Sequence, residues 1–521
     1  MDRRCFVTLI PFASLSIAAT RSYAQTALTD ESRKEFEQLL APIPSQQRKL
    51  SQFSAFNLEP QNLFDRILFW HESALEITAK DHTPLLPLPQ GGNPSQQPDP
   101  RRFGEQLGPH RSSYAMAVTH IAMFEAINAF TKKYKSYTGY SNSAALPNGA
   151  SVDAAVAQAT HDALVHLYPF KQGDIDSILA SDLGRIGVSD ANKQDGIQVG
   201  QSAAASIVNK RKDDGSQLQE IKFSDLPPDN GIGKWAIDPI SKIQTALGAR
   251  WGMVSPFLLQ SGSQFRLSAP PAPNNLRFIK AFNEVKDVGR AGDFPKDTSR
   301  REGEKFKAIF WAYDGTPNLC APPRLYNQVI RTIGVDVKKI SDPTELARLF
   351  ALCNTAMADA AIAAWDSKYH WRYWRPVTGL RWAAPGLDPS NIPDQNWQPL
   401  GSPDTNAAGP NFTPPFPAYP SGHATFGGAL FQVLRRVFAA DGDRIPFVLV
   451  SDEFDGQNRG VGDKGPRPYL PSSYVVLSDA EFENAFSRVW LGVHWRPDGE
   501  DGIALGNKVG DWAFDHAFAA V

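Results

Sequence analysis

Apolar side chains recur along much of the chain at spacings of three and four residues, the period of one face of an α-helix. The clearest example is the segment 341–368, in which these spacings run from Leu346 to Ala361. Asp342 and Pro343 precede the pattern, and such a pair is typical of a helix cap followed by the first helical position. The segment therefore predicts a long helix with a defined start.

The segments 112–131 and 151–168 show the same period, but they are Ala-rich and apolar on more than one face. Helices with this distribution are buried on most of their circumference. The chain has no alternating apolar and polar runs joined by Asn-Gly turns, and no strand-helix alternation typical of a parallel sheet. These patterns predict an all-α protein, a large helical chain built around two four-helix-type bundles.

The 41 prolines gather between the predicted helices, so we expect long Pro-rich connections over the surface. The proline-rich stretches are 81–101, 224–240, 268–274 and 383–420. We predict a division near residues 275–300, with an N-terminal helical region over 25–290 and a C-terminal helical region over 291–521. All the candidate chemistry described below falls in the C-terminal region.

Composition narrows the class of protein. With 521 residues, 42% of them hydrophobic, and a formal net charge of −2, the chain can build sizeable cores and is typical of a soluble protein. The near-neutral charge argues against a nucleic acid or another polyanion as partner. We expect no apolar run after the N-terminus to reach the length of a membrane span, and the sequence leaves the oligomeric state open.

The first 24 residues have the features of an export signal peptide. Arg3 and Arg4 give a basic start, an apolar stretch extends to Ala19, and the small residues Ser22 and Ala24 suit cleavage after Ala24. The arginine pair favours the bacterial twin-arginine route. We therefore expect an exported protein, in the periplasm or secreted.

Cleavage would remove Cys5 and leave Cys320 and Cys353 in the mature chain. Two cysteines cannot build a disulfide scaffold, although a single bridge is compatible with an oxidising compartment. Cys353 lies within the apolar helical pattern, which equally fits two buried free thiols. The sequence leaves both alternatives open.

The first stretch with candidate chemistry is KYHWRYWRP, residues 368–376. Lys368 and Arg375 are seven residues apart, about two helical turns, so on a helix both cations point to one side. Pro376 disfavours helix at Arg375 and is expected to end the element. Alone, the pair also fits a solvated cationic face beside aromatic residues.

The second stretch is YPSGHATFGGALFQVLRRVF, residues 419–438, in which a turn precedes an apolar helix. Ser421 can cap that helix, Gly422 lets the backbone approach a ligand closely, and His423 adds a titratable group. The first turn of a helix also offers unpaired N–H groups and the positive end of the helix dipole, which suits an anion. The alternative is a tight turn with a hydrogen-bonded histidine.

The third stretch is SRVWLGVHWRPD, residues 487–498. Arg488 and His494 are six residues apart, close to one helical face, and Asp498 follows His494 by four residues. A hydrogen bond from one imidazole nitrogen to Asp498 would fix the tautomer and leave the other nitrogen free as a metal ligand or nucleophile. The alternative is an aromatic core segment in which Arg488 pairs with a carboxylate.

Together the three stretches predict a site for a tetrahedral oxoanion. Lys368, Arg375 and Arg488 would surround it with positive charge, next to a serine hydroxyl, a glycine N–H and two histidines. Unpaired buried cations are costly, so a multiply charged anion is needed to make such a cluster tolerable. Arginine forks with a lysine suit phosphate or vanadate.

The three stretches match, in order, the patterns K-x6-R-P, P-S-G-H and S-R-x5-H-x3-D. This set resembles the pattern shared by the vanadium-dependent haloperoxidases and the acid phosphatases of the type 2 phosphatidic acid phosphatase superfamily. Further stretches resemble the vanadium chloroperoxidases of fungi and their bacterial relatives: FWAYDG at 310–315, PPRLYNQVIR at 322–331, FTPPFPAYPSGHATFGGA at 412–429 and FENAFSRVWLGVHWRPD at 482–498, with weaker similarity in GPHRSSYAMAVTHIAMFEA at 108–126. The resemblance covers most of the mature chain and is strongest over 310–500.

Two aromatic positions also resemble the chloroperoxidases. Trp365 precedes Lys368 by three residues and Phe416 precedes Ser421 by five, where algal bromoperoxidases tend to have histidine at the second position. The resemblance implies an apolar halide pocket formed by Trp365 and Phe416. Without it, both residues fit an ordinary aromatic core.

The resemblance implies roles for the site residues. The vanadate-binding positions would be Lys368, Arg375, Ser421, Gly422, His423, Arg488 and His494. His494 would bond to the vanadium, oriented by Asp498, and Asp314 would pair with an arginine in the outer shell. His423 would act as general base toward hydrogen peroxide, and Lys368 would polarise the peroxide before a halide attacks it.

The resemblance thus implies a vanadium haloperoxidase that uses hydrogen peroxide to oxidise chloride or bromide to hypohalous acid, which halogenates small organic acceptors. The alternative is a secreted acid phosphatase with a phosphohistidine intermediate on His494, in which His423 protonates the leaving group. A non-catalytic protein that sequesters phosphate or vanadate fits the pocket but not the proton-handling His423. No feature of the sequence indicates an organic-substrate cleft.

Overall fold

Helices form most of the described part of the computed structural model, which covers residues 27–42, 59–84, 103–229, 231–292, 298–382, 391–460 and 463–521. The helices are α1 (Asp30–Leu39), α2 (Leu63–Asp81), α3 (Pro109–Thr131), α4 (Tyr140–Ser143), α5 (Val152–Leu167), α6 (Gln172–Arg185), α7 (Asp190–Arg211), α8 (Leu276–Val288), α9 (Thr298–Phe310), α10 (Pro322–Arg331), α11 (Pro343–Trp371), α12 (Pro376–Arg381), α13 (Gly422–Val437), α14 (Leu477–Trp490) and α15 (Arg496–His516). The predicted export signal, with Cys5, lies outside the described residues.

Within the described ranges, the sheet structure consists of two antiparallel pairs of short strands. β1 (Ile221–Lys222) pairs with β2 (Thr245–Ala246), and β3 (Phe447–Leu449) pairs with β4 (Ser472–Tyr474). Strands of two or three residues are too short to form a layer of their own. The prediction of an all-α protein is therefore confirmed, with these small ribbons as additions.

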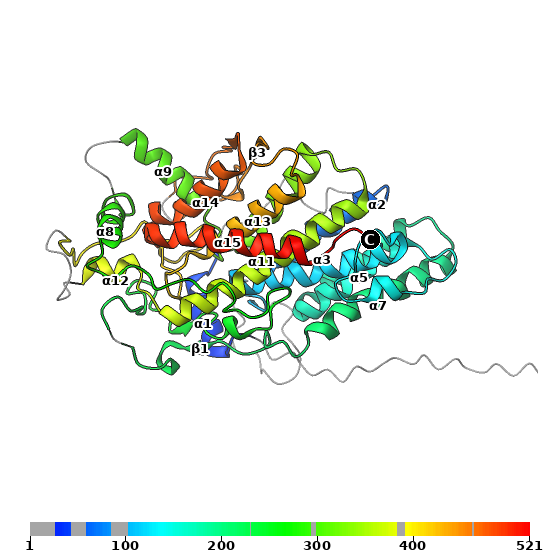
Figure 1. Ribbon diagram of the computed structural model, residues 1–521, viewed down its shortest axis with the longest axis horizontal. Coiled ribbons are helices and arrows are strands. Elements are labelled where there is room, and N and C mark those ends of the chain that lie inside the picture. The colour runs from blue at the N-terminus through cyan, green and yellow to red at the C-terminus, as the bar shows by residue number, and fades with distance from the viewer. Residues whose placement is uncertain are drawn as a thin grey trace, which may run out of the picture.

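The helices pack in two groups that meet at the centre of the molecule (Figure 1). In one group α3, α5 and α7 contact one another, and α2 packs against α5; in the other, α13 contacts α11, α14 and α15. The central helix α11 also packs along α3, and one hydrophobic core continues through both groups. The expected pair of bundles is thus present, while the domain boundary at residue 290 stays a prediction.

The long central helix α11 begins as the sequence predicts. Asp342 is its N-cap and accepts hydrogen bonds from the backbone N–H groups of Thr344, at 2.7 Å, and Glu345, at 3.3 Å. One expectation needs correction, because α11 is long and apolar enough to cross a membrane by length and composition alone. Since 94% of its most apolar 18-residue window is buried inside the protein, it serves as a core helix here.

The end of α11 also differs from the sequence prediction. The helix stops at Trp371 because Arg372 adopts the left-handed conformation, with φ of 48°, and Pro376 then begins α12 at its first helical position. Lys368 therefore lies on α11, whereas Arg375 is the N-cap residue of α12. The two cations do not share a helical face, and the proline starts the next element.

The two cysteines of the described chain are both buried and both free. Cys320 lies in the turn before α10, and Cys353 lies inside α11. Of the two alternatives left open by the sequence, the structure has the free thiols.

Candidate oxoanion-binding active site

The three sequence motifs meet at the ends of four helices. Lys368 is near the C-terminus of α11, Ser421 caps α13, Arg488 lies in the last turn of α14, and His494 stands in the connection before α15. The expected helical face shared by Arg488 and His494 does not exist, because α14 ends at Trp490. Tertiary packing, rather than helical spacing, brings these side chains together.

The start of α13 forms one side of the site. The Ser421 hydroxyl oxygen accepts a hydrogen bond from the N–H of Ala424 at 3.4 Å, and the N–H of Ser421 donates to the backbone carbonyl of Asp498 at 2.9 Å. Gly422 is the first helical residue, and a Cβ there would lie 3.4 Å from the Trp365 ring. The junction is thus fixed against α15 and presents the positive end of α13 to the site.

His494 is held in one tautomer by two neighbours. Its Nδ1 atom lies 2.8 Å from Oδ2 of Asp498, and its Nε2 atom lies 3.0 Å from Nη1 of Arg375. A guanidinium can only donate, so Nε2 is the acceptor and Nδ1–H donates to the carboxylate. Burial, followed by the charges of Arg375 and Lys368, lowers the pKa of His494 well below its usual range. The ring is therefore neutral, with its lone pair on Nε2.

The carboxyl group of Asp498 is itself buried. Its Oδ2 atom also accepts a hydrogen bond from the N–H of Trp495 at 3.0 Å, and burial raises its pKa to about 7. Asp498 stands in the first turn of α15, where a carboxylate is favoured by the helix dipole. This position fixes the orientation of the His494 ring.

His423, in the first turn of α13, lines the cavity described below together with His494. Its Nε2 atom is 2.7 Å from the backbone carbonyl oxygen of Ala312, which can only accept a hydrogen bond. Burial, followed by the charge of Arg488, lowers the pKa of His423 well below its usual range. The neutral ring therefore carries its proton on Nε2 and has an unprotonated Nδ1 that can accept one.

Two arginines have buried N–H groups without a protein partner. Arg375 uses Nε toward the carbonyl of Phe416, at 2.9 Å, and Nη1 toward Val493, at 2.8 Å, but Nη2 is unpaired. Arg488 uses Nη2 toward Asp314, whereas Nε and Nη1 are unpaired. Leaving several charged donors buried and unsatisfied is costly, so these atoms fit a bound oxoanion that accepts from them.

Lys368 is fully buried, and its contacts differ from those expected. Its ammonium group donates to the backbone carbonyls of Pro417 and Ala418, both at 2.9 Å, and of Pro420. These three bonds use all three of its N–H donors and hold the loop that leads into α13. Burial, followed by the charge of Arg375, lowers the pKa of Lys368 well below its usual range.

Asp314 pairs with Arg488, as the resemblance implies, with 2.6 Å between Oδ1 and Nη2. Burial raises the pKa of this carboxyl group, while the arginine opposes that effect. The cluster holds three basic side chains, Lys368, Arg375 and Arg488, against two carboxyl groups, those of Asp314 and Asp498. Its excess of positive charge again suits an anion.

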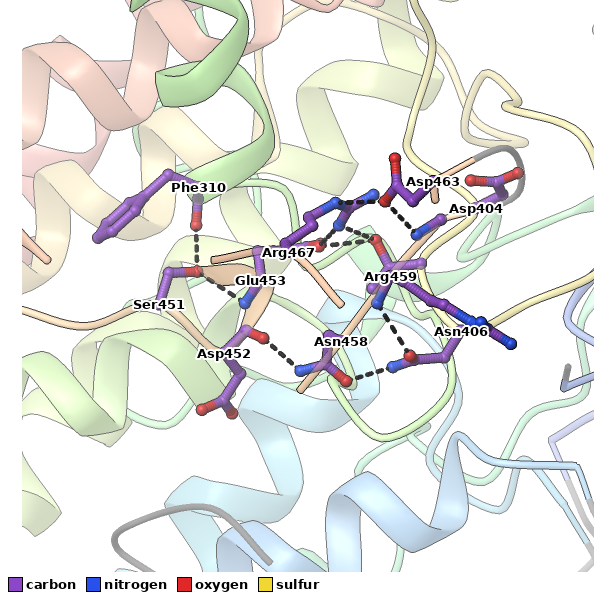
Figure 2. A network of polar contacts seen from close by, with 12 residues as sticks. Phe310, Asp404, Asn406, Ser451, Asp452, Glu453, Asn458, Arg459, Asp463 and Arg467 are labelled. Atoms are coloured by element: carbon purple, nitrogen blue, oxygen red, sulfur yellow. Dashed lines mark hydrogen bonds and ion pairs between the residues drawn. The ribbon is translucent and has the colours of Figure 1, made fainter. Parts of the chain in front are cut away.

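A polar network supports the segment that carries Asp314 (Figure 2). The Ser451 hydroxyl donates to the carbonyl of Phe310 at 2.6 Å, and the N–H of Asp452 donates to the Tyr313 hydroxyl at 2.8 Å. In the same network Asn458 donates to the carbonyl of Asp452. These bonds fix residues 310–314, which supply both the carbonyl bonded to His423 and the carboxylate bonded to Arg488.

A cavity of about 630 Å³, counted with its open mouth, leads to the site. His423, His494, Arg488 and Gly422 line it together with Trp365 and Phe416, whose ring centres are 5.0 Å apart. The ammonium nitrogen of Lys368 lies 5.5 Å from the Trp365 ring centre and 5.1 Å from that of Phe416. The two predicted halide-pocket aromatics therefore form a wall beside the cluster.

Part of the cavity wall comes from the N-terminal region, which the sequence analysis missed. The wall includes Phe36, Leu39 and Leu40 at the end of α1, Leu107, Gly108 and Pro109 before α3, and Leu247. The amphipathic pattern of residues 30–40 signals a packed helix but gives no indication of its partner. The residues with candidate chemistry still all lie in the C-terminal region, while the apolar wall that the N-terminal region adds was not predicted.

Comparison with known proteins places this geometry in context. Residues 348–521 match the family model of the VCPO second helical-bundle domain. The vanadium chloroperoxidase of Curvularia inaequalis is 37% identical over 236 residues, covering 39% of this chain. The match spans only 37% of the length of that relative.

Solved structures share the fold over most of the chain. The first bacterial vanadium-dependent iodoperoxidase matches with a TM-score of 0.66 and 23% identity, over 88% of this chain and 99% of that one. An apo-type bacterial vanadium-dependent chloroperoxidase matches with a TM-score of 0.58 and 19% identity, over 78% of this chain and 94% of that one. Residues 348–521 therefore match the VCPO second helical-bundle domain, in a chain that shares its fold with solved bacterial vanadium-dependent iodoperoxidase and chloroperoxidase structures.

Proposed function

We propose that this protein is a vanadium-dependent haloperoxidase, which uses hydrogen peroxide to oxidise a halide to hypohalous acid. The observation that carries the proposal is the group of unpaired buried donors on Arg375 and Arg488 beside the basic Nε2 of His494. The matched second-bundle domain and the chloroperoxidase relative support the choice of vanadate as the oxoanion.

The residues present fit vanadate in charge and donor type. Arg375 and Arg488 would donate to its oxygens, together with the Gly422 N–H and the Ser421 hydroxyl, and His494 would offer Nε2 to the metal. When bound, vanadate supplies Lewis acidity that activates hydrogen peroxide for attack by a halide. Asp498 holds His494 in the tautomer that this bond requires.

The proton of incoming hydrogen peroxide is assigned to His423. Its Nδ1 atom is unprotonated, because Nε2–H is committed to the Ala312 carbonyl, and the side chain lines the cavity. A neutral histidine of lowered pKa can accept a proton where the reagent enters. The Lys368 charge, close to the aromatic wall, adds electrostatic pull in a dry environment.

We assign the halide to the wall formed by Trp365 and Phe416, and we propose chloride as well as bromide as substrates. Low polarity at this wall strengthens the effect of nearby charges, which the harder oxidation of chloride requires. An acid phosphatase could use the same histidines, but hydrolysis has no use for an apolar wall beside the oxoanion. The wall therefore favours halide oxidation.

We also propose that residues 1–24 direct export by the twin-arginine route, since the segment has the basic, apolar and small-residue regions of a signal. N-terminal sequencing of protein recovered from the periplasm or medium tests this proposal. A mature N-terminus at Gln25 is expected, and an intact Met1 in the exported protein would contradict it.

The activity is tested by bromination of monochlorodimedone with vanadate, hydrogen peroxide and bromide, beside p-nitrophenyl phosphate hydrolysis by the vanadate-free protein. We expect vanadate-dependent bromination that Arg488→Ala abolishes. The matched control is Arg496→Ala, which removes a partly exposed arginine paired with Glu284 at 2.7 Å and should retain activity. Phosphate hydrolysis without any bromination would favour the phosphatase instead.

A further inference from the structure

The lining of the cavity at the oxoanion site combines polar and apolar side chains. The part that carries Arg488, His423 and His494 is called the floor here, and the rest is a wall of aliphatic, aromatic and proline side chains. These wall residues are Phe36, Leu39, Leu40, Leu107, Pro109, Leu247, Phe412, Pro414 and Pro415. Besides the floor residues, the described lining residues with a titratable group are Tyr313 and Asp314.

The tyrosine hydroxyl and one carboxylate oxygen on the lining are bonded elsewhere, while Oδ2 of Asp314 has no protein partner. The Tyr313 hydroxyl accepts from the N–H of Asp452 at 2.8 Å, and Oδ1 of Asp314 pairs with Arg488. A cationic ligand therefore meets excess positive charge at the floor, and an anionic ligand competes with the oxoanion for the same arginines. The cavity best fits a molecule without charge.

Part of the apolar wall is supplied by α1, which polar contacts hold in place. Glu35 accepts hydrogen bonds from the Thr245 hydroxyl at 2.9 Å and from the N–H of Gln244 at 3.1 Å. At the other end, the N–H of Ala408 donates to the carbonyl of Ala41 at 2.7 Å. These bonds tie α1 to neighbouring segments, and Phe36, Leu39 and Leu40 line the cavity.

We infer that this cavity is a binding site for the organic halogen acceptor, an uncharged apolar molecule with an electron-rich aromatic ring or alkene. The inference rests on the proposed function, because the oxidant forms at the cavity floor. A concave, mainly apolar lining with a few convergent polar groups is typical of small-molecule sites. The acceptor is thus halogenated inside the protein, before hypohalous acid is released.

The transfer balances without a further reagent. The carbon nucleophile gives an electron pair to the halogen of hypohalous acid, so a C–X bond forms and the X–O bond breaks. The ring then loses its proton to the departing hydroxide, which gives the halogenated product and water. The apolar wall contributes by holding the carbon close to the floor and excluding competing water.

A competition experiment tests this inference. The vanadate-loaded enzyme receives hydrogen peroxide and bromide with an equimolar mixture of 1,3,5-trimethoxybenzene, which is apolar, and monochlorodimedone, which is an anion at neutral pH. The same mixture is treated with hypobromous acid alone. We expect the enzyme to raise the ratio of brominated trimethoxybenzene to brominated dimedone at least fivefold above the ratio given by the free reagent, and equal ratios overturn the inference.

Variants locate the effect. Leu39→Gln puts a polar group on the cavity wall and should return the ratio to that of the free reagent, whereas Leu68→Gln, at a similarly buried leucine of α2 away from the cavity, should leave it raised. Because both products come from one oxidant, the ratio does not depend on the fraction of folded enzyme. An equal loss of selectivity in both variants overturns the inference.

Direct binding separates this inference from the proposed function. Saturation-transfer NMR with trimethoxybenzene and vanadate-free protein should give a signal for the wild type and for Leu68→Gln, and none for Leu39→Gln. If the enzyme oxidises no bromide while this pattern holds, the proposed function fails and the apolar site stands. If the wild type gives no transfer, the site itself is wrong.

Discussion

His494 directs Nδ1–H at Asp498, 2.8 Å away, and thereby leaves Nε2 as the acceptor nitrogen of the ring. Nε2 accepts from Arg375 at 3.0 Å. The lowered pKa of His494 and the raised pKa of Asp498 both reflect burial, which disfavours the charged form of each group. The pair is arranged to present an uncharged basic nitrogen among cations.

The first prediction is that His494→Ala abolishes halogenation. The proposal assigns the bond to vanadium to Nε2, so its removal should weaken vanadate binding by more than about 100-fold, beyond the typical effect of an outer-shell change. Equilibrium dialysis of vanadate against wild type and variant measures this directly. Tight vanadate binding with undiminished bromide oxidation in the variant would contradict the assignment.

The second prediction concerns Asp498→Ala. Losing the acceptor for Nδ1–H frees the ring to rotate or change tautomer, so vanadate affinity should fall by about 10–100-fold while some activity remains at saturating vanadate. Activity titrated against vanadate concentration gives the apparent affinity. Asp501→Ala, which removes a nearby carboxylate paired with Arg277, serves as the matched control and should keep wild-type affinity.

The third prediction is competition between oxoanions. Phosphate resembles vanadate in shape and charge, and the site offers unpaired arginine donors rather than ligands selective for a metal cation. Added phosphate should therefore slow reconstitution by vanadate and inactivate the enzyme. Reconstitution that is insensitive to millimolar phosphate would remove support for the shared site.

The sequence predicts much of this arrangement because short motifs encode local geometry. The Asp342 cap of α11, the Ser421 cap of α13 and the bond from His494 to Asp498 each involve residues within four positions of one another. Caps and i,i+4 contacts can be read from spacing alone. The fold class follows in the same way from helical periodicity.

Other features depend on contacts between distant segments and could not be predicted. Arg375 lies beyond the end of α11 at Trp371 and is held in the site by bonds to the carbonyls of Phe416 and Val493. These two residues are 41 and 118 positions away in the sequence. Leu39 lines the cavity from a helix far along the chain. Spacing carries no information on such contacts, because packing of whole helices decides them.

The fourth prediction concerns pH and His423. The pKa of His423 is lowered in the folded state. Below the unfolded-state value of about 6.5, the unfolded chain therefore binds more protons than the folded one, and the free energy of unfolding decreases as the pH is lowered. This residue can contribute a loss of at most about 1.4 kcal/mol per pH unit. Guanidinium unfolding of the vanadate-free protein at pH 7.5 and 5.0 gives the free energy of unfolding at each pH. Its decrease between pH 7.5 and 5.0 should be smaller in His423→Asn than in the wild type. Equal losses would mean that His423 is not held neutral.

The last prediction is that the enzyme oxidises chloride and that Phe416→His reduces chloride turnover more than bromide turnover. The Phe416 ring centre lies 5.0 Å from that of Trp365 and 5.1 Å from the Lys368 ammonium, so a histidine there would bring water and a competing hydrogen bond beside the charge. Chloride is harder to oxidise than bromide, so a loss of electrostatic pull affects it first. Phe412→His, at another buried aromatic of the cavity wall, is the matched control and should change both rates in proportion. Steady-state rates with each halide at mildly acidic pH decide the question. Proportional losses in Phe416→His, or no chloride activity in the wild type, would leave Phe416 as a packing residue of the loop.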